Sequence, residues 1–398
     1  MSKRAKILTA IFSIFCFAIG AAVGALANLI YTSPDSYEIP AKIAAVCEVV
    51  EGEIDAEVIS DKKFSIHFLE LGNKYTGDCT LVKVGDTEML IDAGSKESSI
   101  PTIKNYLDKY VTDDKLEYVV VTHAHQDHYA GFASSNEDGS IFDFYEIGTI
   151  IEFAQTYKSA ESGIHKRYEE QKAAAVSEYG TTVFDALECY NYEEVGGKQA
   201  ERKFELGEDT GVFCEILYHK FYEEANKDEA HSENNFSVCL QIVDGDNKYL
   251  FTGDLEEEGE SSLVDSNEAV LTGNYKVYKA GHHGSKTSSS DKLMQVIKPE
   301  IVTVCCCAGS DEYTSKNENQ FPTQEFINNV YEANPTAKIY VTTLCVDYKA
   351  NSFKSFNGNI VIAIAVGTTT PEVYCANNGT DLKDTDWFKA NRTLPQAA

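Results

Sequence analysis

Residues 118–128 read Tyr-Val-Val-Val-Thr-His-Ala-His-Gln-Asp-His, and this stretch decides the fold of the chain. Its first half is a β-branched apolar run, which predicts a buried strand that ends near Thr122. Its second half places three imidazoles and one carboxylate within six residues, on the turn that leaves this strand. Neutral imidazole and carboxylate groups suit zinc, iron or manganese. The stretch therefore predicts a metal site that begins at a strand end.

Three further polar clusters also follow predicted strands. Asp92 precedes a small-residue turn, and we expect its carboxylate to orient a ligand histidine. Asp254 follows an apolar strand and Gly253, a position from which a carboxylate can bridge two cations. His282 and His283 lie between glycines, and we expect one of them to bind a second metal while the other supports it or touches substrate. An ordinary turn aspartate and a solvated loop are the alternative interpretations of these clusters.

Strand and helix patterns alternate along two similar halves of the chain. This order predicts two sheets packed face to face with helices outside. The predicted strands are 64–70, 79–84, 88–91, 118–122, 211–218, 236–243, 249–251, 276–279, 301–307, 337–343 and 360–366. The predicted helices are 99–110, 289–296 and 323–333, with helix and loops over 157–195.

Taken together, the motifs resemble those of the metallo-β-lactamase superfamily and, in detail, the nuclease-like domain of ComEC-type bacterial competence proteins. The resemblance covers roughly residues 64–366. It implies an α/β fold, a four-layer αβ/βα sandwich, and hydrolysis by a metal-activated water. It also implies one or two divalent metals, with zinc expected and manganese or iron as alternatives. The motifs are Ile91-Asp92-Ala93-Gly94, His123-Ala124-His125-Gln126-Asp127-His128, Thr252-Gly253-Asp254 and Lys279-Ala280-Gly281-His282-His283-Gly284-Ser285, supported by Gly77-Asp78-Cys79 and Asn234-Asn235-Phe236-Ser237-Val238.

Carried over by position, the resemblance implies specific site residues. The implied metal ligands are His123, His125, Asp127, His128, Asp254 and His282, and the implied catalytic residues are Asp127, His283 and Asp92. The superfamily usually has a further ligand histidine between the second and third motifs, where this chain offers His219, His231 or Asn234-Asn235 without a clear match. Either the first metal has three protein ligands or only one metal binds tightly.

The charge of the chain restricts its partners. Its 398 residues carry 34 basic and 63 acidic side chains, a formal net charge of −29. Such a surface repels polyanions, which argues against binding long nucleic acids. Competence proteins also carry a multi-helix membrane channel, whereas this chain has one apolar segment, so DNA import is not implied. We expect a small-molecule or cell-envelope phosphodiester as substrate, with a short oligonucleotide as an alternative.

The N-terminus predicts export of the domain. Basic residues at 3–6 precede an apolar run over 7–30, and 24 helical residues at about 1.5 Å each would span a bilayer. We expect a cytoplasmic stub at 1–6, a single-pass membrane anchor at 7–30 and an acidic linker at 31–63. A hydrolase domain at 64–370 and a tail at 371–398 would then be extracellular. A signal peptide cleaved near Ala25-Leu26-Ala27 is the alternative, and it would make the domain secreted.

The sequence thus predicts an extracytoplasmic, metal-dependent hydrolase, with phosphodiester bonds as the favoured target. A lactonase, thioesterase or β-lactamase activity would use the same residues. From a different class, the chain could be a surface-binding module whose metal site is vestigial.

Overall fold

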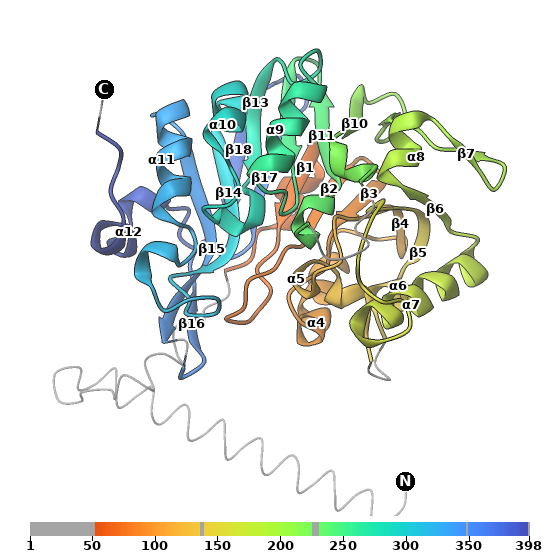
Figure 1. Cartoon of the computed structure of the whole chain (residues 1–398), viewed down its shortest axis with the longest axis horizontal. Helices are drawn as coiled ribbons and strands as arrows, with labels where there is room; N and C mark the ends of the chain where they lie inside the picture. The colour runs from red at the N-terminus through yellow and green to blue at the C-terminus, as the bar shows by residue number, and fades with distance from the viewer. Residues whose placement is uncertain (1–51, 136–138, 225–230, 348, 397–398) are drawn as a thin grey trace, which may run out of the picture. The chain divides into compact units, whose positions relative to one another are not determined.

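The first of two eight-stranded sheets carries the motif at 123–128 (Figure 1). The structure is a computed structural model that describes residues 52–135, 139–224, 231–347 and 349–396. In this sheet β3, β4, β5 and β6 run parallel, while the remaining neighbours pair antiparallel. The strands, in spatial order, are β18 (Pro371–Cys375), β17 (Ile360–Ala365), β1 (Lys62–Phe68), β2 (Thr80–Val84), β3 (Thr87–Ile91), β4 (Lys115–Val121), β5 (Glu146–Glu152) and β6 (Thr182–Asp185).

The second sheet carries the other two ligand motifs. Its strands β12 to β15 run parallel, and its remaining neighbours pair antiparallel. The strands, in spatial order, are β16 (Ser352–Ser355), β15 (Lys338–Asp347), β14 (Ile301–Ala308), β13 (Asn274–Lys279), β12 (Asn247–Phe251), β11 (Cys239–Asp244), β10 (Val212–Leu217) and β9 (Lys203–Glu205). A separate hairpin joins β7 (Glu194–Val195) to β8 (Lys198–Gln199).

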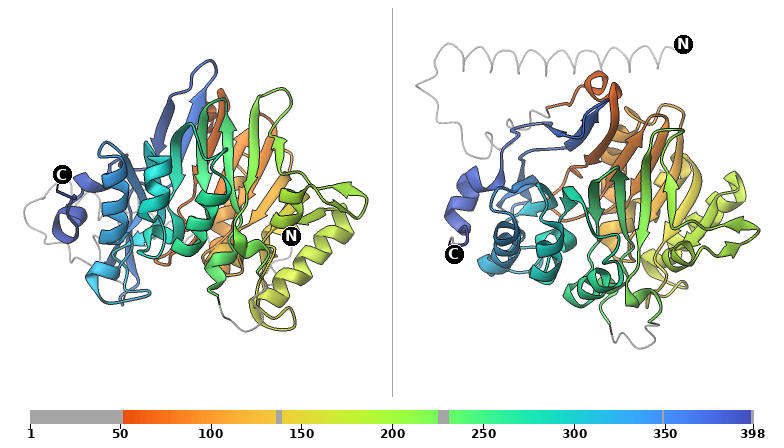
Figure 2. Two further views of the ribbon diagram at one scale, coloured as in Figure 1. Left: turned by 45° about the horizontal axis from the view of Figure 1, so that its top comes forward. Right: turned by 90° about the horizontal axis from the view of Figure 1, so that it is seen from above.

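Helices cover the outer faces of the sheets. Figures 1 and 2 show α9, α10 and α11 in a row against the second sheet. In α11 the hydroxyl of Thr323 accepts a hydrogen bond from the N–H of Phe326, and Phe326, Ile327, Val330 and Tyr331 form its buried face. The helices are α3 (Ala56–Ser60), α4 (Ile100–Leu107), α5 (Gln126–Tyr129), α6 (Ile141–Phe144), α7 (Gly163–Tyr179), α8 (Ala186–Asn191), α9 (Glu257–Ser266), α10 (Asp291–Ile297), α11 (Gln324–Ala333) and α12 (Asp386–Asn391).

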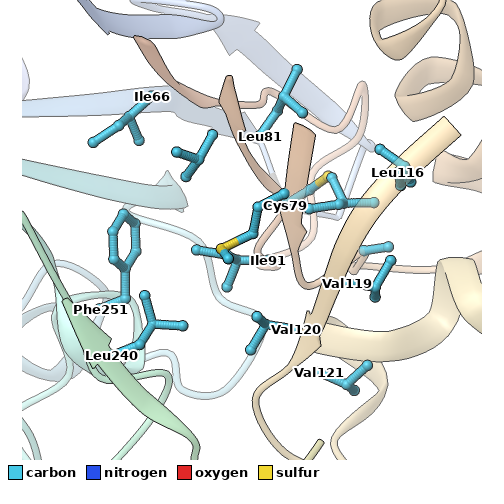
Figure 3. Packing of buried hydrophobic residues seen from close by; sticks show 14 of the residues in the cluster. Ile66, Cys79, Leu81, Ile91, Leu116, Val119, Val120, Val121, Leu240 and Phe251 are labelled. Carbon is cyan, nitrogen blue, oxygen red and sulfur yellow. The ribbon is translucent and has the colours of Figure 1, made fainter. Parts of the chain in front are cut away.

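Aromatic pairs join the inner faces of the two sheets. The rings of Phe64 in β1 and Tyr249 in β12 meet edge to face at 5.2 Å, and Phe68 stacks on Phe251 at 6.2 Å. Figure 3 shows side chains of both sheets, among them Val120, in the same cluster of buried residues. The expected α/β sandwich, with sheets face to face and helices outside, is confirmed.

Parallel pairing brings the chemically important loops to one edge of each sheet. Ile91 at the end of β3 is paired with Val120 of β4, so Asp92 and the histidine motif leave the first sheet together. In the second sheet β12 and β13 are parallel neighbours, and Asp254 and His282 follow their carboxyl ends. The fold therefore gathers loops that are far apart in the sequence.

Some sequence expectations need correction or lie outside the structure. β5 was not predicted, because Gly148 interrupts its pattern; a Cβ there would lie 2.7 Å from the carbonyl oxygen of Glu117. The stretch 157–195 contains the strands β6 and β7 besides α7 and α8. β1 begins before residue 64, and β18, within the expected tail 371–398, pairs with β17. The predicted anchor at 7–30 lies outside the described residues. Of the helices that are described, none combines the length and apolar composition needed to cross a bilayer.

Candidate metal centre

One buried carboxylate oxygen, Asp254 Oδ2, is the centre of the site. The Nε2 atoms of four histidines approach it, and they come from the loops after β4 and β13. Gly253 makes the approach possible, because its φ is +52° and a Cβ there would lie 2.7 Å from Ser237 Oγ. The four distances to Asp254 Oδ2 are 3.2 Å from His128, 3.4 Å from His283, 3.9 Å from His282 and 4.0 Å from His123.

The turn after β4 positions the predicted motif. His125 is the N-cap of the short helix α5, and its carbonyl accepts a 3.0 Å hydrogen bond from the N–H of His128. This compact turn leaves His125 Nδ1 3.1 Å from His123 Nε2. The chain of Gly94 lies directly against it, because a Cβ at that position would lie 1.6 Å from the carbonyl oxygen of Asp127. A glycine from the Asp92 loop is therefore part of the metal motif's packing.

Asp92 orients His128, the role that its place at a strand end predicts. Its Oδ2 lies 2.7 Å from His128 Nδ1, and a carboxylate can only accept, so this imidazole nitrogen carries the hydrogen. Asp92 also accepts hydrogen bonds from Thr122 N at 2.8 Å and Thr122 Oγ1 at 2.7 Å. These contacts point the other nitrogen of His128 at Asp254.

A second carboxylate, Asp78, holds His283 and was not predicted as a site residue. Asp78 Oδ1 lies 3.3 Å from His283 Nδ1, while Asp78 Oδ2 forms an ion pair with the buried ammonium of Lys279. The carbonyl of Cys305 lies 3.1 Å from the same His283 nitrogen. Asp78 precedes its strand rather than following it, so its position does not match the strand-end pattern of the other clusters. Its presence in Gly77-Asp78-Cys79 was the available signal.

The electrostatics divide the histidines into two groups. Burial lowers the pKa of His123, His125 and His282, which keeps these three imidazoles neutral. Burial also disfavours charge on His128, but the carboxylates of Asp254 and Asp92 outweigh it and raise the pKa of His128 to about 10. For His283 burial is likewise outweighed, here by Asp254 and Asp78, and its pKa is raised. Protons on His128 and His283 balance the buried carboxylates.

The residues present fit divalent metal ions. His128 Nε2, His283 Nε2 and Asp254 Oδ1 are buried and have no hydrogen-bond partner among the described residues. Leaving such atoms unsatisfied is costly, and a cation at this point would satisfy them. Ligand atoms of Asp78, His128, Asp254 and His283 lie within 4.8 Å of one another. Imidazole and carboxylate ligands suit zinc, manganese and iron.

The structure gathers the six predicted ligands, whereas other candidates face different partners. Asp127 joins on one side, where its Oδ2 lies 3.6 Å from His283 Nε2. His219 Nε2 bonds the carbonyl of Ser237 at 2.8 Å, and its ring packs on Tyr222. His231 Nε2 lies 3.3 Å from Glu224 Oε2. Asn234 does border the site, because its Nδ2 lies 3.4 Å from His282 Nδ1.

An aromatic pair borders the site on its open side. Tyr313 is 58% exposed and donates a 3.0 Å hydrogen bond from its hydroxyl to Asp127 Oδ2. The ring of Phe321 lies 5.4 Å from Tyr313 and 5.8 Å from His282. Both residues lie in the loop between β14 and α11, which has no metal-binding signature. No pattern in the sequence therefore indicates them.

Comparisons with known proteins match the part of the chain that forms this site. The family described as the metallo-beta-lactamase superfamily matches residues 72–134 and 229–308, which include every site residue named so far except His219, Tyr222, Glu224, Tyr313 and Phe321. Over 73 residues the chain is 34% identical to Recombination protein 2 of Haemophilus influenzae, covering 18% of this chain and 9% of that protein. Over 68 residues it is 41% identical to Competence protein ComA of Neisseria gonorrhoeae, covering 17% and 10%. The match thus spans about a tenth of these relatives' length.

A solved structure gives a weaker likeness. The metallo-beta-lactamase fold protein YhfI from Bacillus subtilis aligns with a TM-score of 0.39 and 13% sequence identity. The alignment covers 70% of this chain and 96% of that one.

Proposed function

Because this chain carries a metallo-β-lactamase superfamily domain that is similar in part to competence proteins, we propose that it hydrolyses phosphodiester bonds with the help of divalent metals. The fold and the candidate metal cluster suggest a metal-dependent hydrolase. The observation that carries this proposal is the convergence of imidazole nitrogens on Asp254 Oδ2, with orienting carboxylates behind His128 and His283.

Binding of two metals would offset the negative charge of the site, which an anionic substrate requires. Four carboxylates (Asp78, Asp92, Asp127 and Asp254) against one ammonium (Lys279) give −3 when the histidines are neutral. One divalent ion changes this to −1, and two change it to +1. Glu256 and Glu312 also act on His282 and Asp127, so two metals would remove most of the negative charge that otherwise repels a phosphodiester on this chain of net charge −29.

The protein's own groups have distinct tasks in this proposal. Bound divalent ions would supply Lewis acidity and would activate water near neutral pH. Asp92 keeps His128 in the tautomer that presents Nε2 to the centre, and the Asp78–Lys279 pair does the same for His283. Asp127 lies on the open side, where Oδ2 can hold a proton of the reacting water. The hydroxyl of Tyr313, which donates to Asp127 in this structure, would donate to a substrate oxygen instead when substrate binds.

A substrate panel tests the proposal. The purified protein is assayed with bis-p-nitrophenyl phosphate, a lactone and nitrocefin, with added zinc, manganese or iron. We expect hydrolysis of the phosphodiester, lost in His125→Ala and retained in His231→Ala, a histidine paired with Glu224. Cleavage of the lactone or nitrocefin alone would instead favour the lactonase, thioesterase or β-lactamase alternative. No hydrolysis by a protein that also binds no metal would favour a surface-binding module.

We also propose that the domain is extracytoplasmic and is anchored by residues 7–30, so that its substrate is a small or cell-envelope phosphodiester. The basic residues before an apolar run of 24 support this topology. Release of the full-length chain from membranes by detergent but not by salt is the expected result. Digestion of the domain by protease added to intact cells or spheroplasts tests which side it faces.

A further inference from the structure

The double-histidine motif presents two adjacent rings to the site, and they diverge. His282 and His283 both have left-handed backbone, with φ of +44° and +52°, a conformation that non-glycine residues rarely adopt. Their ring centroids are 6.3 Å apart and the ring planes are inclined by 69°. Both Nε2 atoms nevertheless approach Asp254 Oδ2, at 3.9 Å and 3.4 Å. Asp254 therefore lies between two rings that come from consecutive residues.

His283 belongs with Asp127 and His128. Its Nε2 lies 3.6 Å from Asp127 Oδ2, and its ring centroid is 5.2 Å from that of His128. Its other nitrogen is engaged by Asp78 and the carbonyl of Cys305. The open nitrogen of His283 is thus directed at the Asp127 and His128 side of Asp254.

His282 borders a different segment, residues 234–237. Its Nδ1 lies 2.9 Å from Thr287 Oγ1 and 3.4 Å from Asn234 Nδ2. His123 borders the same segment, because its Nδ1 lies 3.3 Å from Ser237 Oγ. His125 is next to His123, with 3.1 Å between their nitrogens. A segment of four residues thus links His282 to the His123 and His125 side of the site.

We infer that the two histidines serve different metals: His283 binds with Asp127, His128 and Asp254, while His282 binds with His123, His125 and Asp254. In this arrangement His282 replaces the ligand histidine that the sequence lacks between its second and third motifs. Asn234, which lies in that region, borders His282 and donates from Nδ2 to Glu256 Oε1 at 3.0 Å. Thr287 accepts a hydrogen bond from Nδ1, which leaves Nε2 free as the ligand. This division rests on the proposed function only in requiring that two metals bind.

Glycine substitutions offer a matched test, because positive φ suits glycine at both positions. His282→Gly and His283→Gly are loaded with zinc, dialysed against buffered free zinc, and analysed for metal per chain without any substrate. We expect two zinc ions in the unchanged protein and in His231→Ala, and one in each glycine variant. Added imidazole should restore the second ion to His282→Gly. Cobalt absorption spectra of the two glycine variants should differ, since each keeps a different site.

Double variants identify the shared site. His125→Ala combined with His282→Gly should still bind one ion, because both changes empty the same position. His125→Ala combined with His283→Gly should bind none. The reverse pattern would overturn the division, as would a single zinc in the unchanged protein. Thr287→Val, which keeps the histidine, should weaken only the ion that His282→Gly loses. All these results are independent of the substrate, so failure of the phosphodiesterase proposal would leave them interpretable.

Discussion

Replacing Asp92 by asparagine tests whether a buried carboxylate sets the metal affinity through His128. Asp92 is 1% exposed, and its Oδ2 receives both the Nδ1 hydrogen of His128 and the hydroxyl of Thr122, each at 2.7 Å. Asparagine can still accept a hydrogen bond from Thr122 N, but it presents an NH₂ group to Thr122 Oγ1 and His128 Nδ1. The His128 ring then favours the tautomer with hydrogen on Nε2, which blocks the nitrogen that faces Asp254.

The expected loss follows from the behaviour of such supporting groups. Removing the partner behind a ligand histidine lowers metal affinity roughly 10- to 100-fold, or about 1.4–2.7 kcal/mol. A second effect of the substitution opposes this loss of affinity. Asp92 is one cause of the raised pKa of His128, so without its charge the proton that competes with zinc for His128 is easier to remove. Since that pKa is about 10, proton competition weakens as the pH rises towards it. The full loss should therefore appear at pH 9 rather than at pH 7.

Competition with a chromophoric chelator measures zinc affinity at both pH values. Asp185→Asn is the matched control, because Asp185 makes the same kind of contact, accepting 2.8 Å hydrogen bonds from Leu187 N and Glu188 N, but at the start of α8. It should leave zinc affinity unchanged. If the zinc affinity of Asp92→Asn at pH 9 is within about twofold of that of the unchanged protein, then Asp92 does not orient His128 for metal binding.

Four further predictions concern the same site. Zinc binding at pH 7 should release protons, seen by calorimetry in buffers of different ionisation enthalpy, because the pKa of His128 is about 10. Because the pKa of His128 is raised to about 10 in the folded protein, protonation of His128 stabilises the metal-free fold, fully so below about pH 6.5. This stability should be lost as the pH rises through about 10, and a flat thermal stability over that range would contradict the prediction. Gly94→Ala should lower the amount of zinc bound per folded chain, because the added Cβ would lie 1.6 Å from the carbonyl oxygen of Asp127 and displace the turn that holds the ligands. A normal zinc content would show that Gly94 does not lie so close to Asp127. Tyr313→Phe should lower kcat about tenfold or more with unchanged zinc content, since the change keeps the ring and removes only the hydroxyl that bonds Asp127; an unchanged kcat would remove Tyr313 from the reaction.

The sequence alone predicted the layers of the fold and most of the site. Apolar runs such as Tyr118–Val121 are long and β-branched, so their strands are evident without tertiary information. Residues that follow such strands, including His123 and Asp254, could be assigned because parallel strands end at a common edge. Short or interrupted strands were missed, as at Gly148, where close approach to Glu117 requires a glycine that weakens the strand pattern.

Tertiary structure decided which groups stand behind the predicted ligands. Asp78, which precedes β2 of the first sheet, reaches His283 and Lys279 of the second sheet only because the two sheets pack together. Tyr313 reaches Asp127 across 186 positions of sequence. The divergence of His282 and His283 depends on left-handed backbone, which no feature of the residue pair encodes. Ligand identity is a local property of the chain, whereas the direction of each ligand is set by contacts that form only when the two sheets meet.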